Sequence, residues 1–193
     1  MKNFLNDLLT SVVATLFLAL IVCGAYPVVV WGVGQVLFHD KANGSLLFKD
    51  GKVVGSRLMA QGFSETQYFH PRPSAAGDGY DAANSGGSNL GPLSQKLIDA
   101  VKERTEKYRA INGLPPGAVV PADAVTASSS GLDPHISIGN ALLQAPRVAQ
   151  ARRMPEDKVR TLIRKYTEGR DLAILGDPRV NVLLLNLALD EMK

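Results

Sequence analysis

The chain has 193 residues and a mass of 20.6 kDa, with 46% hydrophobic and 20% charged residues, which excludes an intrinsically disordered protein. The net charge is +3 and the isoelectric point is near 9.0, but basic and acidic residues alternate in stretches such as Lys102-Glu103-Arg104. This pattern is typical of a solvated helix face, so we expect no nucleic-acid partner. The hydrophobic residues are concentrated at the N-terminus, and this excludes a purely soluble protein.

The N-terminal apolar segment, Leu8–Phe38, contains 31 residues without one charged side chain. As a helix it would extend about 46 Å, which exceeds the ~30 Å hydrocarbon core of a bilayer. A signal peptide fits poorly, because its apolar region has about 7–15 residues behind a basic start, and here Asp7 offsets Lys2. We predict an uncleaved transmembrane anchor in residues 1–38, with a kink or a change of direction at Pro27, and a soluble domain in residues 39–193. A single span cannot form a pore, so this chain alone transports nothing.

The side of the membrane that the domain occupies stays open at this stage. Lys2 precedes the span, whereas Lys41, Lys49 and Lys52 follow it, and this count favours a cytoplasmic domain. Long domains, however, are translocated largely regardless of their charge. Cys23, the one cysteine, lies within the anchor, so the domain has no disulfide and is compatible with an oxidising compartment without requiring it.

Local patterns predict the first elements of the domain. Segments 45–49 and 52–56 flank Asp50-Gly51, and both of these residues tolerate a positive φ, so the pattern predicts a β-hairpin. Residues 67–69 are expected to be extended. Residues 71–92 form a 22-residue stretch with five glycines and three prolines, and a loop of this length in a compact domain is functional or disordered.

Helical periodicity dominates the rest of the chain. A helix is expected from Pro92 to Asn112-Gly113, and a second helical stretch should be interrupted by Pro146. Pro155 should open a further helix, residues 172–175 could form a short strand, and residues 180–192 should form the last helix. We therefore predict the α+β class: one transmembrane helix followed by a mixed, helix-dominated domain with a β-hairpin.

Familiar catalytic motifs are missing from the sequence. It contains no phosphate-binding G-x-x-x-x-G-K-[ST], no H-E-x-x-H and no G-x-S-x-G. The three histidines, His39, His70 and His135, are far apart and lack cysteine partners, so we expect no metal site.

Two polar segments have alternative interpretations. Ser130, Asp133 and His135 could belong to a single-pass envelope hydrolase; alternatively, Asp133-Pro134 forms a turn and Ser137 caps the next helix. The glycine-rich loop before Pro92 could bind an anion such as phosphate at a helix N-terminus, or it could be a flexible loop whose Asn89 or Gly91 caps that helix.

The aromatic and basic stretch 68–73 has two interpretations as well. It could form a docking edge for another protein, or it could cover the core.

Taken together, these segments resemble the KdpC family, the C subunit of the Kdp-type potassium-transporting P-type ATPase of bacteria. The matching segments run in family order and are 55–63, 68–75, 80–81, 84–92, 125–128, 130–137, 144, 147–149, 176, 178–183 and 186–190. The departures are small: Ser129 stands where the family usually has glycine, and Ile138-Gly139 replaces a commoner Pro-Ala pair.

The resemblance implies a non-catalytic accessory subunit of a high-affinity, ATP-driven potassium uptake complex. Its expected partners are the channel-like potassium-translocating subunit, which carries the ion, and the catalytic P-type ATPase subunit. The family implies a role in ATP affinity, and the positions that we assign to it are Gln61, Ser85, Gly86, Gly87, Ser88 and Asn89. The residues that we expect to contact partners are Tyr68, Phe69, His70, Arg72, Asp133, His135, Arg147, Arg179 and Asn181.

The resemblance also implies a location in the inner membrane with the domain on the outer, periplasmic face. A domain outside the cell cannot touch cytosolic ATP. In that orientation any effect on ATP affinity acts indirectly, through coupled conformations.

Overall fold

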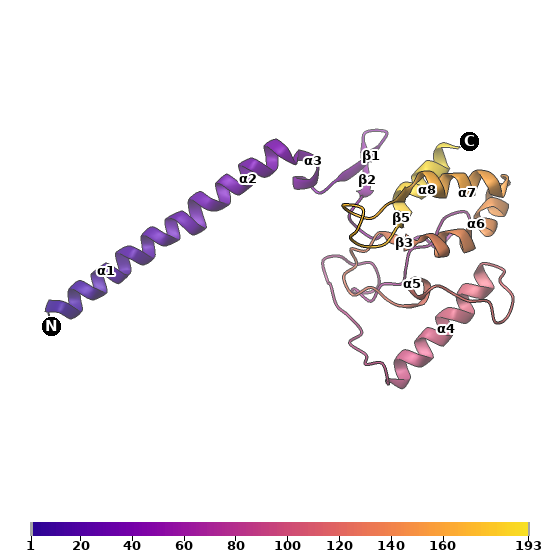
Figure 1. The fold of residues 1–193 in the computed structure, drawn as a ribbon, viewed down its shortest axis with the longest axis horizontal. Helices are drawn as coiled ribbons and strands as arrows, with labels where there is room; N and C mark the ends of the chain where they lie inside the picture. Colours follow the sequence, from indigo (N-terminus) through magenta and orange to yellow (C-terminus); the bar gives the residue numbers. More distant parts are fainter. Residues whose placement is uncertain (1, 193) are drawn as a thin grey trace. The chain divides into compact units, whose positions relative to one another are not determined.

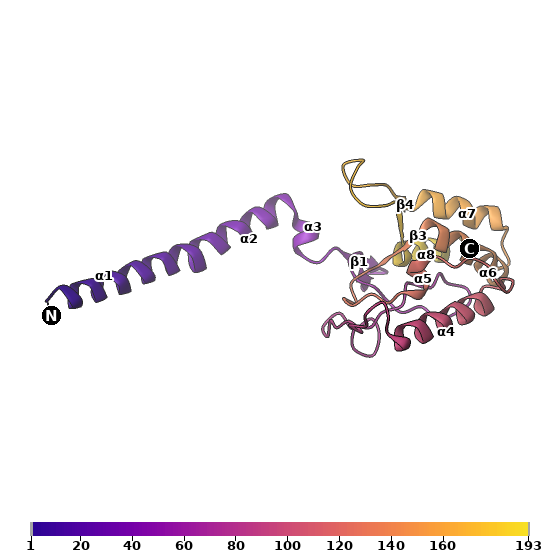
Figure 2. The same cartoon turned by 60° about the horizontal axis from the view of Figure 1, so that its bottom comes forward.

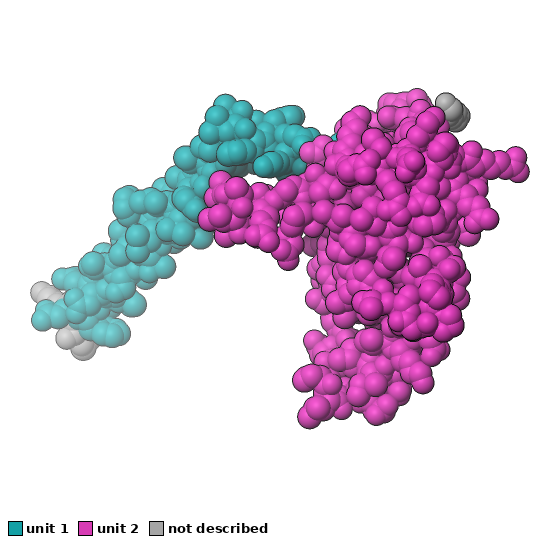
Figure 3. Space-filling view, turned by 45° about the vertical axis from the view of Figure 1, so that its right-hand side comes forward, with its two compact units in different colours: residues 1–46 teal, residues 47–193 magenta. Residues whose placement is uncertain are grey.

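The computed structural model describes residues 2–192, and the chain divides into two compact units, residues 1–46 and residues 47–193 (Figure 3). Each unit is considered by itself below. The domain boundary after residue 38 stays a prediction.

The first unit is built from helix. Its elements are α1 (Lys2–Ala19), η1 (Leu20–Ala25), α2 (Tyr26–Leu37) and the short α3 (His39–Ala42) (Figure 1). The first three form one run, in which the 35 residues Asn3–Leu37 are long and apolar enough to cross a membrane. The predicted N-terminal apolar helix is confirmed, and it begins before Leu8.

A single π-helical turn separates α1 from α2 and lies directly before Pro27. The amide of Tyr26 donates to the carbonyl of Ile21, five residues back. Proline has no amide hydrogen, and its ring would collide with the carbonyl of Cys23 in a regular α-helix. The wider turn gives that carbonyl room, so the helix passes Pro27 without ending.

The second unit begins with the predicted hairpin, β1 (Leu46–Lys49) and β2 (Lys52–Ser56). Asp50 and Gly51 form its turn with φ values of 51° and 74°. These are the left-handed conformations that a tight two-residue hairpin turn requires, so local turn chemistry sets this element.

A small antiparallel sheet organises the C-terminal half. It has the order β3-β5-β4, formed by β3 (His135–Ser137), β4 (Thr167–Glu168) and β5 (Arg179–Asn181). Its register pairs His135 with Asn181, and Arg179 with both Ser137 and Glu168.

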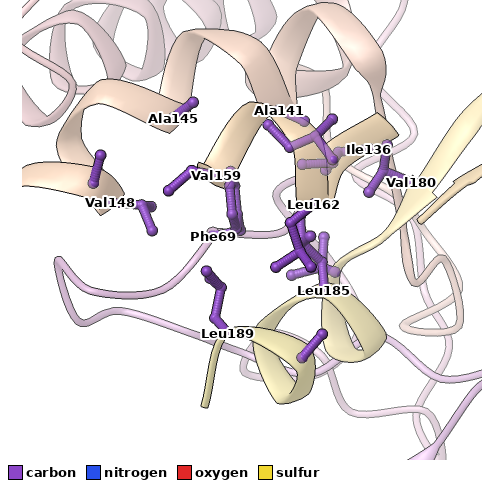
Figure 4. Packing of buried hydrophobic residues seen from close by; sticks show 14 residues of the cluster. Phe69, Ile136, Ala141, Ala145, Val148, Val159, Leu162, Val180, Leu185 and Leu189 are labelled. Carbon is purple, nitrogen blue, oxygen red and sulfur yellow. The ribbon is translucent and has the colours of Figure 1, made fainter. Parts of the chain in front are cut away.

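Helices follow or precede these strands and enclose the core. They are α6 (Ile138–Arg152), α7 (Glu156–Lys165) and α8 (Val182–Glu191), while α4 (Gln95–Ile111) and α5 (Ala122–Val125) lie on the other side of β3 from α7 (Figures 1 and 2). Phe69 is fully buried between the small residues of α6 and the leucines of α8 (Figure 4). The buried cluster around it is Ile136, Ala141, Ala145, Val148, Ala149, Val159, Leu162, Ile163, Val180, Val182, Leu185, Ala188 and Leu189.

Three local predictions were wrong. Helix α6 continues through Pro146, which lies on its exposed face. Proline leaves one helix carbonyl without an amide donor, and on this face water can donate a hydrogen bond to that carbonyl instead. Residues 172–175 form a tight turn and no strand, because Leu172 and Ala173 have positive φ. The last helix begins at Val182, because residues 179–181 pair in the sheet as β5.

The segment 67–69 also differs from the prediction. It forms no strand; instead, the amide of Tyr68 donates to the carbonyl of Glu65 in a turn. Side chains from α6 and α8 satisfy the backbone of this segment, as described below.

Candidate functional site

Two serine-rich loops, which the sequence presents 45 residues apart, lie side by side in the domain. The amide of Ala75 donates to the carbonyl of Ser128, and the amide of Ser128 donates to the carbonyl of Pro73, both at 2.8 Å. Further along, the amide of Gly86 donates to the carbonyl of Ser129 at 2.8 Å, and the hydroxyl of Ser85 donates to the carbonyl of Ser130 at 2.7 Å. We call residues 84–89 and 128–131 together the paired loops.

Two glycines of the paired loops lie where a side chain would have little room. A Cβ at Gly87 would lie 3.1 Å from the Cβ of Ser129, which is tighter than nine in ten real Cβ contacts. Gly131 has a φ of +67°, and a Cβ there would lie 3.1 Å from the backbone of Asp81 and Ala82. Bulk at Gly87 would press against Ser129 of the other loop, and bulk at Gly131 would press against the backbone of residues 81–82.

The glycine-rich loop does not lead directly into a helix. Helix α4 begins at Gln95 with Ser94 at its N-cap position, so the predicted helix start at Pro92 and a cap formed by Asn89 or Gly91 are wrong. Residues 85–89 are exposed. They present polar atoms to solvent, but the positive end of the α4 dipole lies beyond them along the chain.

Asp133 supports the turn interpretation of its segment. One of its carboxylate oxygens accepts from the amide of His135 at 3.2 Å, and the other pairs with the guanidinium of Arg72 at 2.7 Å. The carbonyl of Arg72 in turn accepts from the hydroxyl of Tyr80 at 3.1 Å. Asp133 thus ties the stretch 68–73, the long loop and the start of β3 together.

The imidazole of His135, in β3, contacts a charged side chain of β4. Its Nε2 lies 3.5 Å from a carboxylate oxygen of Glu168, which also pairs with Arg179 at 3.4 Å. Burial lowers the pKa of His135 and Arg179 lowers it further, while the carboxylates of Glu168 and Asp133 oppose the shift. Arg179 also pairs with Asp171 at 3.2 Å, so the charges form one chain across the three strands of the sheet.

This geometry does not assemble a hydrolase site. The hydroxyl of Ser130 accepts from the amide of Leu132 at 3.0 Å and lies 3.3 Å from the hydroxyl of Ser128, whereas His135 contacts Glu168. Nucleophilic catalysis needs the base within hydrogen-bond reach of the nucleophile. Ser137 does cap α6, because its hydroxyl accepts from the amide of Asn140 at 3.1 Å, and the turn-and-cap alternative is confirmed.

A second polar cluster lies inside the domain and holds an irregular segment. Every backbone carbonyl from Thr66 to His70 accepts a hydrogen bond from a side chain. Arg147 donates to the carbonyls of Thr66 and Tyr68 at 2.5 and 3.0 Å, Arg152 to that of Gln67 at 2.8 Å, Asn186 to that of Phe69 at 3.0 Å, and Gln144 to that of His70 at 3.0 Å. We call these four side chains the backbone clamp.

The side-chain amides of Gln144 and Asn186 in the clamp form the hydrogen bonds that a neighbouring strand would form. The carbonyl oxygen of Asn186 accepts from the amide of Phe69 at 2.8 Å, and that of Gln144 accepts from the amide of His70 at 2.7 Å. Each side chain thus satisfies both backbone groups of one residue, at exposures of only 1%. Since a buried backbone group without a partner is costly, the clamp is what allows an irregular segment to cross the core.

The clamp explains the environments of three predicted contact residues. Phe69 is fully buried and Arg147 is 8% exposed, so Phe69 covers the core and Arg147 serves the clamp. Burial, followed by the charge of Arg147, lowers the pKa of His70, whose Nε2 bonds the carbonyl of Glu65 at 3.0 Å. Contact between a partner and Phe69 or Arg147 would require the domain to open.

The other predicted residues lie elsewhere in the domain. Tyr68 is half-buried under the guanidinium of Arg152, 5.0 Å from the ring centroid, and its hydroxyl donates to Asp190 at 3.2 Å. Asn181 is buried and caps α8, and its side-chain amide nitrogen donates to the carbonyl of Arg57. Neither residue belongs to the paired loops.

Gln61 lies apart from the glycine-rich loop with which the sequence analysis grouped it. Its side-chain amide nitrogen donates to the carbonyl of Val54 at 3.4 Å, and a Cβ added at Gly55 would collide with this nitrogen. Gln61 also lines a small hollow of about 190 Å³ beside α8, together with Phe63, Tyr68 and Asn186. The structure therefore distributes the positions assigned to ATP affinity over two regions.

Sequence reasoning missed Glu168, which pairs with His135 across the sheet, and the ion pair between Arg152 of the clamp and Asp190. Glu168 follows the end of α7 and carries no motif, so no local signal identifies it. Among residues 2–192, no group of three or more histidine, cysteine or acidic side chains is arranged to hold a metal.

Comparison with known proteins matches nearly the whole chain. The family model described as "KdpC: K+-transporting ATPase, c chain" matches residues 8–191. The potassium-transporting ATPase KdpC subunit of Mycobacterium tuberculosis (strain H37Rv) is 55% identical over 187 residues, covering 97% of this chain and 99% of the relative. The subunits of the same name from Koribacter versatilis and Nitratidesulfovibrio vulgaris are 49% and 53% identical, covering 98% and 94% of this chain and 94% and 92% of those relatives.

Proposed function

Since the chain belongs to the KdpC family of potassium-transporting ATPase subunits, we propose that it is a non-catalytic accessory subunit that stabilises the complex and promotes ATP use by the catalytic subunit. Its partners in this proposal are the channel-like subunit that carries potassium and the catalytic P-type ATPase subunit. The observation that carries the proposal is that the charged side chains across the sheet and the polar side chains of the clamp bond to other parts of the domain and hold it together. Such an arrangement suits a rigid docking unit.

The anchor is the first means of assembly. Large apolar side chains along the anchor, among them Phe4, Leu18 and Trp31, are exposed, and Gly24, Gly32 and Gly34 permit close approach of a neighbouring helix. We place the anchor in the inner membrane and the domain on its outer face.

Assembly is tested by Leu18→Arg. An arginine at the centre of a membrane helix costs about 3 kcal/mol on insertion scales, and it would face lipid or a partner helix. We expect the variant to lose co-purification of the other subunits in mild detergent, and with it the potassium-stimulated ATPase activity of the eluate. Leu37→Arg is the matched control, because an arginine at the helix end can reach the interface.

Membrane extraction of both variants first checks that each is inserted. An inserted Leu18→Arg chain that co-purifies with its partners at the wild-type level would overturn the assembly role.

The role in ATP use is assigned to the paired loops. Gly87→Val would place a branched side chain against Ser129 and separate the two loops, so we expect the KM of the complex for ATP to rise several-fold while co-purification is unchanged. Gly91→Val is the control, since a Cβ there meets nothing within 4 Å. An unchanged KM in an intact Gly87→Val complex would remove the paired loops from this role.

Direct and indirect action on ATP are separated by titrating ATP into the full-length chain in detergent. Saturable binding that weakens in Gly87→Val supports direct contact. Absence of binding by the chain alone, together with the KM change in the complex, supports coupling through conformations.

A further inference from the structure

The loop between β4 and β5, residues 169–178, belongs neither to the core nor to the paired loops. It leaves the body of the unit beside β4 (Figure 2). Its tip carries Leu172, Ile174 and Leu175, whose exposed fractions are 83%, 74% and 54%. Single exposed apolar residues are common on protein surfaces, but three within four positions form a patch.

The backbone presents this tip in a fixed conformation. The amide and the carbonyl of Asp171 exchange hydrogen bonds with those of Leu175, both at 2.9 Å, and close the turn. Leu172 and Ala173 adopt φ values of 52° and 65°, which side-chain-bearing residues seldom adopt. A conformation of this kind persists when the surrounding contacts enforce it, and such strain is concentrated at functional positions.

Charged residues surround the base of the loop, but they are paired. Arg170 lies 3.3 Å from Asp177, and Arg179 lies 3.2 Å from Asp171. Between Asp171 and Asp177 the chain carries no charge. The loop therefore ends in an uncharged apolar tip, and its neutralised base lowers the cost of approaching a medium of low dielectric constant.

The length of the tether keeps this domain at a membrane surface. Only residues 38–46 separate the end of the apolar helix from the second unit, and nine residues span at most about 30 Å. A domain of this size has a radius of gyration of about 15 Å. The domain therefore cannot move farther from the bilayer than about its own diameter, and an apolar tip on it meets lipid at a high effective concentration.

We propose that the β4–β5 loop inserts its apolar tip, Leu172, Ile174 and Leu175, into the interface of the bilayer in which this chain is anchored. The loop fixes the orientation of the domain against the membrane as a second, reversible attachment beside the helix. The proposal rests on membrane association of the chain and is independent of the role in ATP use.

The test uses the full-length chain in phosphatidylcholine vesicles with and without brominated acyl chains. Trp31, the single tryptophan, is first replaced by phenylalanine, and Ile174→Trp then reports on the tip. Val119→Trp is the control, because Val119 is 88% exposed in a different loop. Brominated lipid should lower the emission of Ile174→Trp at least about twofold and leave that of Val119→Trp unchanged.

Each other outcome overturns the proposal. Emission of Ile174→Trp that is insensitive to brominated lipid places the tip in water. Quenching of Ile174→Trp by aqueous iodide separates two further outcomes. If the tryptophan is protected from iodide only when the other subunits are present, the tip contacts a protein partner. If its protection increases with the concentration of the chain, the tip contacts a second copy. Equal quenching of both reporters shows contact without a preferred face. None of these results affects the assembly and KM experiments, so the two proposals fail separately.

Discussion

Replacing Gln144 with leucine should lower the free energy of unfolding of the domain by about 3 kcal/mol, because a buried backbone group without its hydrogen bond costs about 1–3 kcal/mol. Leucine has a similar volume, but it leaves both the amide and the carbonyl of His70 without the partners that Gln144 supplies at 2.7 and 3.0 Å. Arg147 loses an acceptor at the same time. The result would show that the loss of stability on replacing Gln144 comes from the hydrogen bonds of the clamp and not from a change in helix propensity.

The measurement is urea unfolding of the full chain in detergent, monitored by the near-ultraviolet circular dichroism of the tyrosines. Four of the five tyrosines lie in the second unit. Gln150→Leu is the matched control: it makes the same change on the same helix at an exposed position, and it should alter stability by less than about 0.5 kcal/mol. Equal effects of the two variants would contradict the role of the clamp.

Phe69→Ala should destabilise the domain by about 3–5 kcal/mol, the usual cost of removing a fully buried phenylalanine ring. The ring is inaccessible to solvent and fills the space between α6, α7 and α8, so its removal leaves a cavity that three packed helices cannot close (Figure 4). A loss of this size approaches the total stability of a small domain.

Phe48→Ala provides the comparison for this second change, because Phe48 in β1 is 65% exposed. The same urea experiment should place its midpoint near that of the wild type. A Phe69→Ala chain with an unchanged midpoint would show that the segment 66–70 leaves the core in solution.

Elements set by local chemistry were predictable from the sequence. Asp50-Gly51 specifies a hairpin turn whatever surrounds it, and α7 carries its apolar residues at helical spacing. The apolar N-terminal helix is fixed by length and composition. By contrast, β4 and β5 have two and three residues, too few to show the alternation of a strand, and they exist because β5 pairs with both neighbours.

The site was predictable only in part, for a related reason. The two loops were recognised separately, but nothing in the sequence shows that Gly87 lies against Ser129, because contacts over this distance arise from the whole fold. Gln144 and Asn186 look like ordinary helix residues until the segment that they bond is placed between them. Polar residues that serve a distant backbone carry no periodic signal of their own.

The wide turn before Pro27 changes how the two halves of the anchor relate to each other. A π turn accommodates one extra residue, so the side chains beyond it lag the regular α-helical phase by about 100°. A stripe of side chains that follows heptad spacing through α1 therefore continues in α2 one residue later in the numbering. A neighbouring helix that runs straight beside this one would therefore contact two sequence registers joined at residues 20–25, and removing one residue from that segment would allow a regular α-helix with a single register.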